Sequence, residues 1–75
     1  MTHTIVRQED NRGELFVHLQ ITDETGIYPY AKWVQGKAYQ AWKADESILD
    51  AIIEGLYPEI ATFRKAQLEA EKEIQ

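Results

Sequence analysis

The side chains that most often act as catalytic bases and nucleophiles are few in this chain and stand far apart. Its two histidines are His3, in a terminal segment that we expect to be loose, and His18, on the outward side of an expected strand. Neither belongs to a His-x-x-x-His or Glu-x-x-His helix motif, so no histidine metal site is indicated. The single serine, Ser47, suits a helix cap and lies in no Gly-x-Ser-x-Gly turn. We therefore expect no catalytic residue, no metal and no enzyme activity.

Carboxylates and glycines also lack the spacing that their chemistry requires. Asp50 and Glu54 stand four residues apart and fit the solvated side of a helix, where acidic residues near the N-terminus are stabilised by the helix dipole. The acidic segment 23–26 is too short for a twelve-residue calcium loop. The four glycines are scattered and do not form a phosphate-binding loop. We expect no small-molecule cofactor.

One stretch, residues 28–43, differs in composition from the rest of the chain. It contains five of the eight aromatic residues and three of the eight basic residues, without any Asp or Glu. Aromatic rings interleaved with lysines can stack on bases while the cations meet phosphates. Tyrosine and tryptophan are equally typical of protein-interaction hot spots. The stretch therefore predicts either a protein-binding or a single-strand nucleic-acid-binding surface.

The expected sheet decides which of these side chains share a face. Alternation along residues 27–34 sends Tyr28 and Tyr30 to one face, and we expect Phe16 of the central strand to lie with them. Trp33 and Trp42 are the aromatic residues most suited to the core, because burying one large ring removes roughly 150–250 Å² of surface from water. The predicted binding surface comprises Phe16, His18, Tyr28, Tyr30, Lys32, Trp33 and Lys37.

The net charge of −5 bears on which class of partner the chain can bind. Residues 1–37 hold four basic and five acidic residues, whereas residues 38–75 hold four basic and eight acidic ones. An acidic chain is repelled by the phosphate backbone, so nucleic-acid binding is disfavoured. The chain has no cysteine, no apolar run of membrane-spanning length and no signal-peptide pattern at its start. We expect a cytoplasmic protein that has no membrane contact.

The elements that must position these residues are three strands followed by helices. Leu15, Val17, Leu19 and Ile21 alternate with more polar residues, which indicates a half-buried strand. Turn-forming segments at 9–13 and 22–26 flank it, each ending in glycine. A short strand around Ile5 precedes it, and a third strand over residues 27–34 contains Pro29, which belongs at a sheet edge. The pattern predicts an antiparallel meander in the order 1-2-3.

Helices are expected to cover one face of this sheet. Residues 37–44 suit a short helix, and Asp45 or Ser47 can cap a second one. The second helix carries the strongest apolar stripe, made of Ile48, Leu49, Ile52, Ile53 and Leu56. A third helix should begin near Pro58 and bury a thin stripe that includes Ile60, Phe63, Ala70 and Ile74. Its polar end either frays or packs on another chain.

The sequence thus predicts a single α+β domain, residues 1–75, with a three-stranded antiparallel meander (1–35) packed against two or three C-terminal helices (36–75). We expect a non-enzymatic accessory module that binds a larger protein or self-associates, through the edge strand or the last helix. By analogy, phage and prophage accessory proteins have this size. Two alternatives are a single-stranded nucleic-acid binder using residues 28–43, and an acidic inhibitor imitating nucleic-acid charge through Asp50, Glu54 and Glu59.

Overall fold

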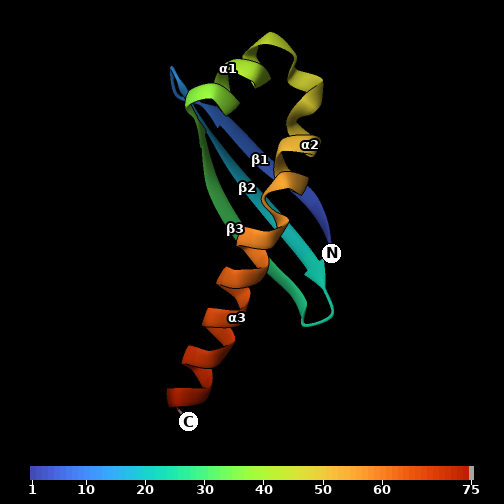
Figure 1. Cartoon of the computed structure of the whole chain (residues 1–75), viewed down its shortest axis with the longest axis vertical. Coiled ribbons are helices and arrows are strands. Elements are labelled where there is room, and N and C mark those ends of the chain that lie inside the picture. The colour runs from blue at the N-terminus through green and yellow to red at the C-terminus, as the bar shows by residue number, and fades with distance from the viewer. Residues whose placement is uncertain (75) are drawn as a thin grey trace.

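The computed structural model describes the backbone of residues 1–74 and the side chains of residues 1–72. An antiparallel sheet in the order β1-β2-β3 is followed by the helices, which confirms the predicted α+β meander (Figure 1). The elements are β1 (Thr2–Asp10), β2 (Glu14–Asp23), β3 (Gly26–Gln35), α1 (Gly36–Ala44), a short 3-10 helix (Glu46–Ile48), α2 (Leu49–Gly55) and α3 (Tyr57–Ile74).

Glycines close both hairpins, as the sequence predicts. Gly13 has φ +108° and Gly26 has φ +122°, values that side chains rarely adopt. In the second turn, the Asp23 carboxylate accepts hydrogen bonds from the backbone N–H and the hydroxyl of Thr25. These bonds and the Thr22–Ile27 pairing fix the register of β2 against β3.

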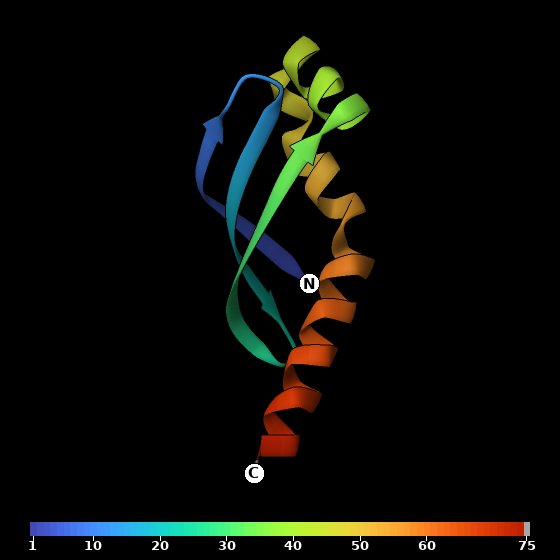
Figure 2. The same ribbon diagram turned by 90° about the vertical axis from the view of Figure 1, so that its left-hand side faces the viewer.

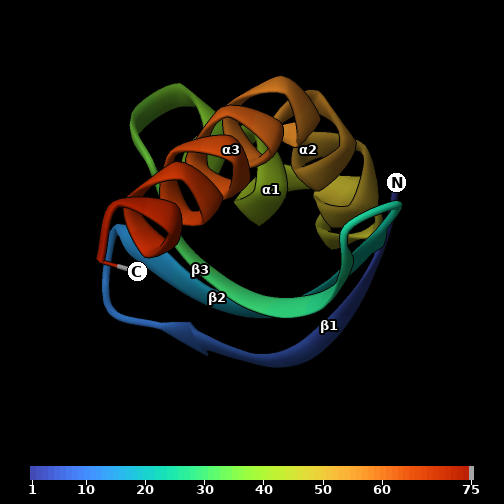
Figure 3. The same cartoon turned by 90° about the horizontal axis from the view of Figure 1, so that it is seen from below.

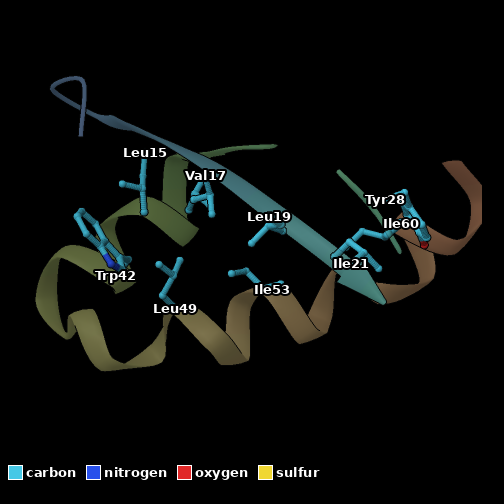
Figure 4. Packing of buried hydrophobic residues seen from close by; sticks show 10 residues of the cluster. Leu15, Val17, Leu19, Ile21, Tyr28, Trp42, Leu49, Ile53 and Ile60 are labelled. Carbon is cyan, nitrogen blue, oxygen red and sulfur yellow. The ribbon is translucent and has the colours of Figure 1, made fainter. Parts of the chain in front are cut away.

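The core lies between β2 and the helices (Figure 4). Leu15, Val17, Leu19 and Ile21 point to the helical side and are at most 2% exposed, which confirms the predicted alternation. The remaining buried hydrophobic residues are Tyr28, Val34, Trp42, Leu49, Ile53 and Ile60. One row from the central strand therefore meets residues from β3 and every α-helix.

The helices differ in detail from the sequence prediction. Asp45 caps the short 3-10 helix, because its carboxylate accepts the Ser47 N–H at 3.1 Å. The N-cap residue of α2 itself is Ile48, and no side chain caps that helix. The predicted α3 stripe is partly wrong. Phe63 is 46% exposed. Arg64 and Leu68, which follow the buried Ile60 at four-residue intervals, are half-buried instead. The expected contribution of Ile74 lies outside the described side chains.

All helices lie on one side of the sheet, which leaves the other side open (Figures 2 and 3). Seen along the molecule, the strands curve around the helices, so the open side is convex (Figure 3). The end of α3 extends past the tip of the β2–β3 hairpin (Figure 1). The molecule measures 46 × 20 × 19 Å. No helix among the described residues is long and apolar enough to cross a membrane.

Candidate binding surface

The open side of the sheet is formed by alternate residues of β2 and β3. Phe16 is paired with Trp33, and His18 with Ala31, so these four side chains lie on the side opposite the helices. We call this side the open face. Trp33 is 40% exposed, and Ile27, near the start of β3, is 63% exposed. The surface is therefore accessible and contains large apolar side chains.

Three rings form a cluster at one end of the open face. The ring centroids of Phe16 and Trp33 are 4.5 Å apart and tilted by 35°, and those of Phe16 and His18 are 4.4 Å apart, edge to face. Such pairs are worth about 0.5–1.5 kcal/mol beyond the area that they bury. They fix the orientation of Trp33 without burying it.

A bulge in β1 shapes the other part of the open face. The register shifts between Ile5 and Arg7, which makes Val6 the extra residue of a β-bulge, and Val6 is 65% exposed. A hollow of about 430 Å³ is lined by Val6, His18, Pro29 and Ala31 of this face together with Leu19, Tyr30 and Phe63, which belong to the helical side. We call it the bulge hollow. The hollow is therefore shared between the open face and the helical side, whereas the aromatic cluster lies on the open face alone.

The strands place few charged side chains on the open face. Arg7 is paired with His18, Glu9 with Phe16, and Glu14 with Gln35, at the end near the aromatic cluster. Arg7 and Glu9 form an ion pair with each other. Little of the net charge of −5 therefore resides on this face.

The predicted placement of Tyr28, Tyr30 and Lys32 beside Phe16 was wrong. Residues opposed in an antiparallel pair share a face, and the partners of Tyr28 and Tyr30 are the buried Ile21 and Leu19. These even-numbered β3 residues consequently face the helices, while the odd-numbered ones form the open face. The expectation that Trp33 joins the core was also wrong, whereas Trp42 is 3% exposed.

Tyr28 is a core residue with a polar end. It is 4% exposed, its hydroxyl donates to Asp23 Oδ2 at 2.6 Å, and the Arg64 guanidinium lies 4.3 Å from its ring centroid. Burial, aided by the Asp23 carboxylate, raises the pKa of Tyr28 to about 12. The hydrogen bonds of Asp23 with Thr25 and Tyr28 lower the pKa of that carboxyl group. This arrangement fastens β3 and α3 together.

Two lysines of the aromatic stretch are engaged by carboxylates. Lys32 Nζ lies 2.7 Å from Glu59 Oε1, and this bond raises the Lys32 pKa. Lys43 donates to Asp10, which also accepts from the Tyr39 hydroxyl at 2.8 Å. Both lysines therefore serve contacts between the sheet and the helices. The remaining one, Lys37, is exposed near the start of α1.

His3 is held in place, contrary to the expected loose terminus. Its side chain is 7% exposed, with Nδ1 at 2.6 Å from the Tyr57 hydroxyl and Nε2 at 2.8 Å from Asp50 Oδ1. Both ring nitrogens are thus engaged by side chains of other elements. These residues lie far apart in the sequence, so no local sequence pattern predicted the contact.

A second hollow, of about 670 Å³, lies between the β2–β3 turn and α3. Its lining mixes acidic residues such as Asp23 and Glu69 with basic ones such as Lys65 and Lys72. Arg64, also in the lining, is tied to the Thr25 hydroxyl at 3.0 Å. The mixture of charges favours no single class of ligand.

Comparison with known proteins adds no assignment to this surface. Among the described residues, no three His, Cys, Asp or Glu side chains are grouped so that they could hold a metal ion. No protein-family model, no curated protein and no solved structure matches this chain.

Proposed function

We propose that this chain is a small, non-enzymatic protein-interaction module of the cytoplasm that binds its partner through the open face. The observation that carries the proposal is the outward row of β3, which comprises Ile27, Pro29, Ala31 and Trp33. In an antiparallel sheet covered on one side, the solvated face is normally polar. An apolar row on that face, containing an exposed tryptophan, is typical of a contact surface.

The charges of the surface favour a protein over a nucleic acid. Lys32 and Lys43, which would have to meet phosphates, are engaged by Glu59 and Asp10 on the helical side of the sheet. The open face itself offers Arg7, already paired with Glu9. A single-stranded nucleic acid would thus find stacking rings there but few free cations.

The acidic-mimic alternative is weakened in the same way. Of its three carboxylates, Asp50 is engaged by His3 and Glu59 by Lys32. A mimic of phosphate charge needs an array of carboxylates free to meet basic residues of its target. The helical side therefore supports the proposal of an acidic inhibitor less well than the open face supports protein binding.

Photo-crosslinking in the host cell tests the proposal directly. Trp33 is replaced by benzoylphenylalanine, and the matched control carries the same residue in place of Ala66, which is exposed on α3. We expect covalent protein adducts from position 33 and none from position 66. Equal labelling from both positions, or no adduct from position 33, would contradict the proposal. Adducts that nuclease digestion removes would instead support nucleic-acid binding.

A further inference from the structure

We propose that the outer edge of β3, over residues 31–35, binds an extended segment of another protein as an additional strand. This site is separate from the open face, so the inference does not rest on the proposed function. Three features of the edge carry it: unpaired backbone groups, an apolar hollow beside them, and the charge at one end of that hollow.

The strand register decides which backbone groups of β3 are free. Asp23 is paired with Gly26 across a two-residue turn, so this pair exchanges both backbone hydrogen bonds, and bonded and non-bonded pairs alternate from there. The even-numbered residues of β3 therefore bond to β2. The N–H and C=O groups of Ala31, Trp33 and Gln35 point the other way, to the outer edge.

This outer edge has no backbone partner within the part of the chain that the structure describes. β3 is the last strand of the sheet, and no backbone hydrogen bond of a turn, loop or cap reaches it. The view in Figure 2 faces this edge, with the helices to one side of it. Pro29 belongs to the outward row and interrupts it, because proline has no N–H. Residues 31–35 keep an uninterrupted set of donors and acceptors, which is what an added strand requires.

A third hollow, of about 250 Å³, runs beside the same stretch. It is lined by consecutive residues 32–35 of β3, whose side chains alternate between the two sides of the sheet, so the hollow lies at the edge itself. Its other wall consists of Ala38, Ile52 and Leu56, which are half-buried apolar residues. Every second side chain of an added strand points to the helical side, and the hollow suits an aliphatic one.

The charges around the hollow favour an acidic residue at one end of the bound segment. Lys32, in the lining, is already paired with Glu59 at 2.7 Å. Lys37 is exposed two residues after the lining residue Gln35, and no carboxylate among the described residues pairs with it. The first turn of α1 has neither an acidic residue nor a side-chain cap, so its N–H groups also favour negative charge. Glu14, paired with Gln35, projects to the open face instead.

Selection from a phage-displayed library of random peptides tests the inference. Peptides of about eight residues are long enough, since a typical strand has about five to six residues. We expect the enriched peptides to alternate apolar and polar residues and to carry an acidic residue at one end. No enrichment, or enrichment of peptides without this alternation, would overturn the inference.

Two proline substitutions separate the edge from other surfaces. Ala31→Pro removes an outward N–H within the site and should raise the dissociation constant of the enriched peptides at least about tenfold. Ile27→Pro makes the same change on the other side of Pro29, outside the site, and should leave that constant within about twofold. Neither substitution removes a bond to β2, so circular dichroism should show the same fold for both. Peptides whose binding survives Ala31→Pro bind another surface, which overturns this inference and leaves the proposed function standing.

Methylation of the peptide's own backbone nitrogens is a test that leaves the chain unaltered. In an added strand every second N–H bonds to β3, so N-methylation should abolish binding at alternate positions only. Equal effects at all positions would contradict strand addition. Repeating the selection with Lys37→Glu should replace the acidic preference by a basic one, and an unchanged preference would overturn the assigned partner.

Discussion

At the scale of single residues, His3 shows how much of this small domain is held by polar contacts between distant segments. The imidazole joins β1 to Asp50 of α2 and to Tyr57 at the start of α3. Nε2 lies 2.8 Å from the Asp50 carboxylate and Nδ1 lies 2.6 Å from the tyrosine hydroxyl. One side chain therefore holds the first strand against the junction of two helices.

We expect His3→Ala to lower the free energy of unfolding by about 1–3 kcal/mol, because two hydrogen bonds are lost and the Tyr57 hydroxyl is left without its partner. Urea unfolding followed by circular dichroism measures the change. The control is Thr4→Ala at the exposed neighbouring position, which should alter stability by no more than about 0.5 kcal/mol. Equal effects of the two substitutions would show that His3 does not fasten β1.

The two faces of β3 should respond differently to truncation. Tyr28→Ala removes a buried ring and should cost about 3–5 kcal/mol, enough to unfold much of a small domain. Trp33→Ala removes a ring that touches Phe16 on the open face and should cost about 1 kcal/mol. Thermal unfolding of the two variants gives the comparison, and a larger loss for Trp33→Ala would reverse our assignment of the faces.

At the scale of the elements, much of the fold could be predicted because local chemistry and burial agree. The alternation over Leu15–Ile21, the turn glycines and the break at Pro58 each have a single physical interpretation. The cap before α2 was less clear, because Asp45 and Ser47 both carry an oxygen suited to the position. In the structure the aspartate accepts and the serine donates to it.

The faces of β3 could not be predicted from its own residues, because both alternating rows are apolar. Ile27, Ala31 and Trp33 are as suited to a core as Tyr28 and Tyr30 are. The signal lay in the register. Pairing Asp23 with Gly26 across the tight turn sets odd-numbered residues of β3 opposite even-numbered residues of β2. Hence the buried odd-numbered row of β2 requires the even-numbered row of β3 to be buried.

For this reason, only three of the seven residues of the predicted surface lie on the open face. Phe16 and His18 follow from the alternation of β2, and both lie on the open face with Trp33. The exposure of Val6 could not be predicted, because a β-bulge leaves no signal in the composition of the strand. Contacts such as that of His3 with Asp50 join residues 47 positions apart, and sequence patterns at the scale of one element do not report them.

The contact between α1 and the end of β1 should depend on pH, because it is made through the Asp10 carboxylate. Hydrogen bonds from Tyr39 and then Lys43 lower the pKa of Asp10 below its ordinary value of 3.8. The group therefore stabilises the folded state fully above that ordinary value, and the contribution is lost as pH falls through the lowered pKa. We expect Asp10→Asn to reduce the melting temperature at pH 6 and to have little effect at pH 2.

The control is Asn11→Ser, which alters an exposed neighbour in the turn without adding a titratable group. Differential scanning calorimetry across this pH range follows both variants. If Asp10→Asn and the unmodified chain differ equally at all pH values, the carboxylate does not act through its ionised form.

At the scale of the whole molecule, the helices bury one side of the sheet and leave the two tryptophans in different surroundings. Trp42 is 3% exposed and Trp33 is 40% exposed. Acrylamide should therefore quench about half of the tryptophan emission of the dilute chain, as expected for one accessible and one inaccessible ring.

Trp33→Phe is the control for this measurement, since its remaining emission comes from the buried Trp42 and should resist quenching. Equal quenching of the unmodified chain and of Trp33→Phe would contradict this assignment of one exposed and one buried ring.

The alternation along β2 has a consequence for how such a protein can evolve. Odd-numbered side chains build the core and even-numbered ones lie on the open face, so adjacent positions in the gene are under unrelated constraints. Mutations in one set can change recognition while the other set maintains folding. A lineage could exchange one contact surface for another in single steps, without passing through an unfolded ancestor.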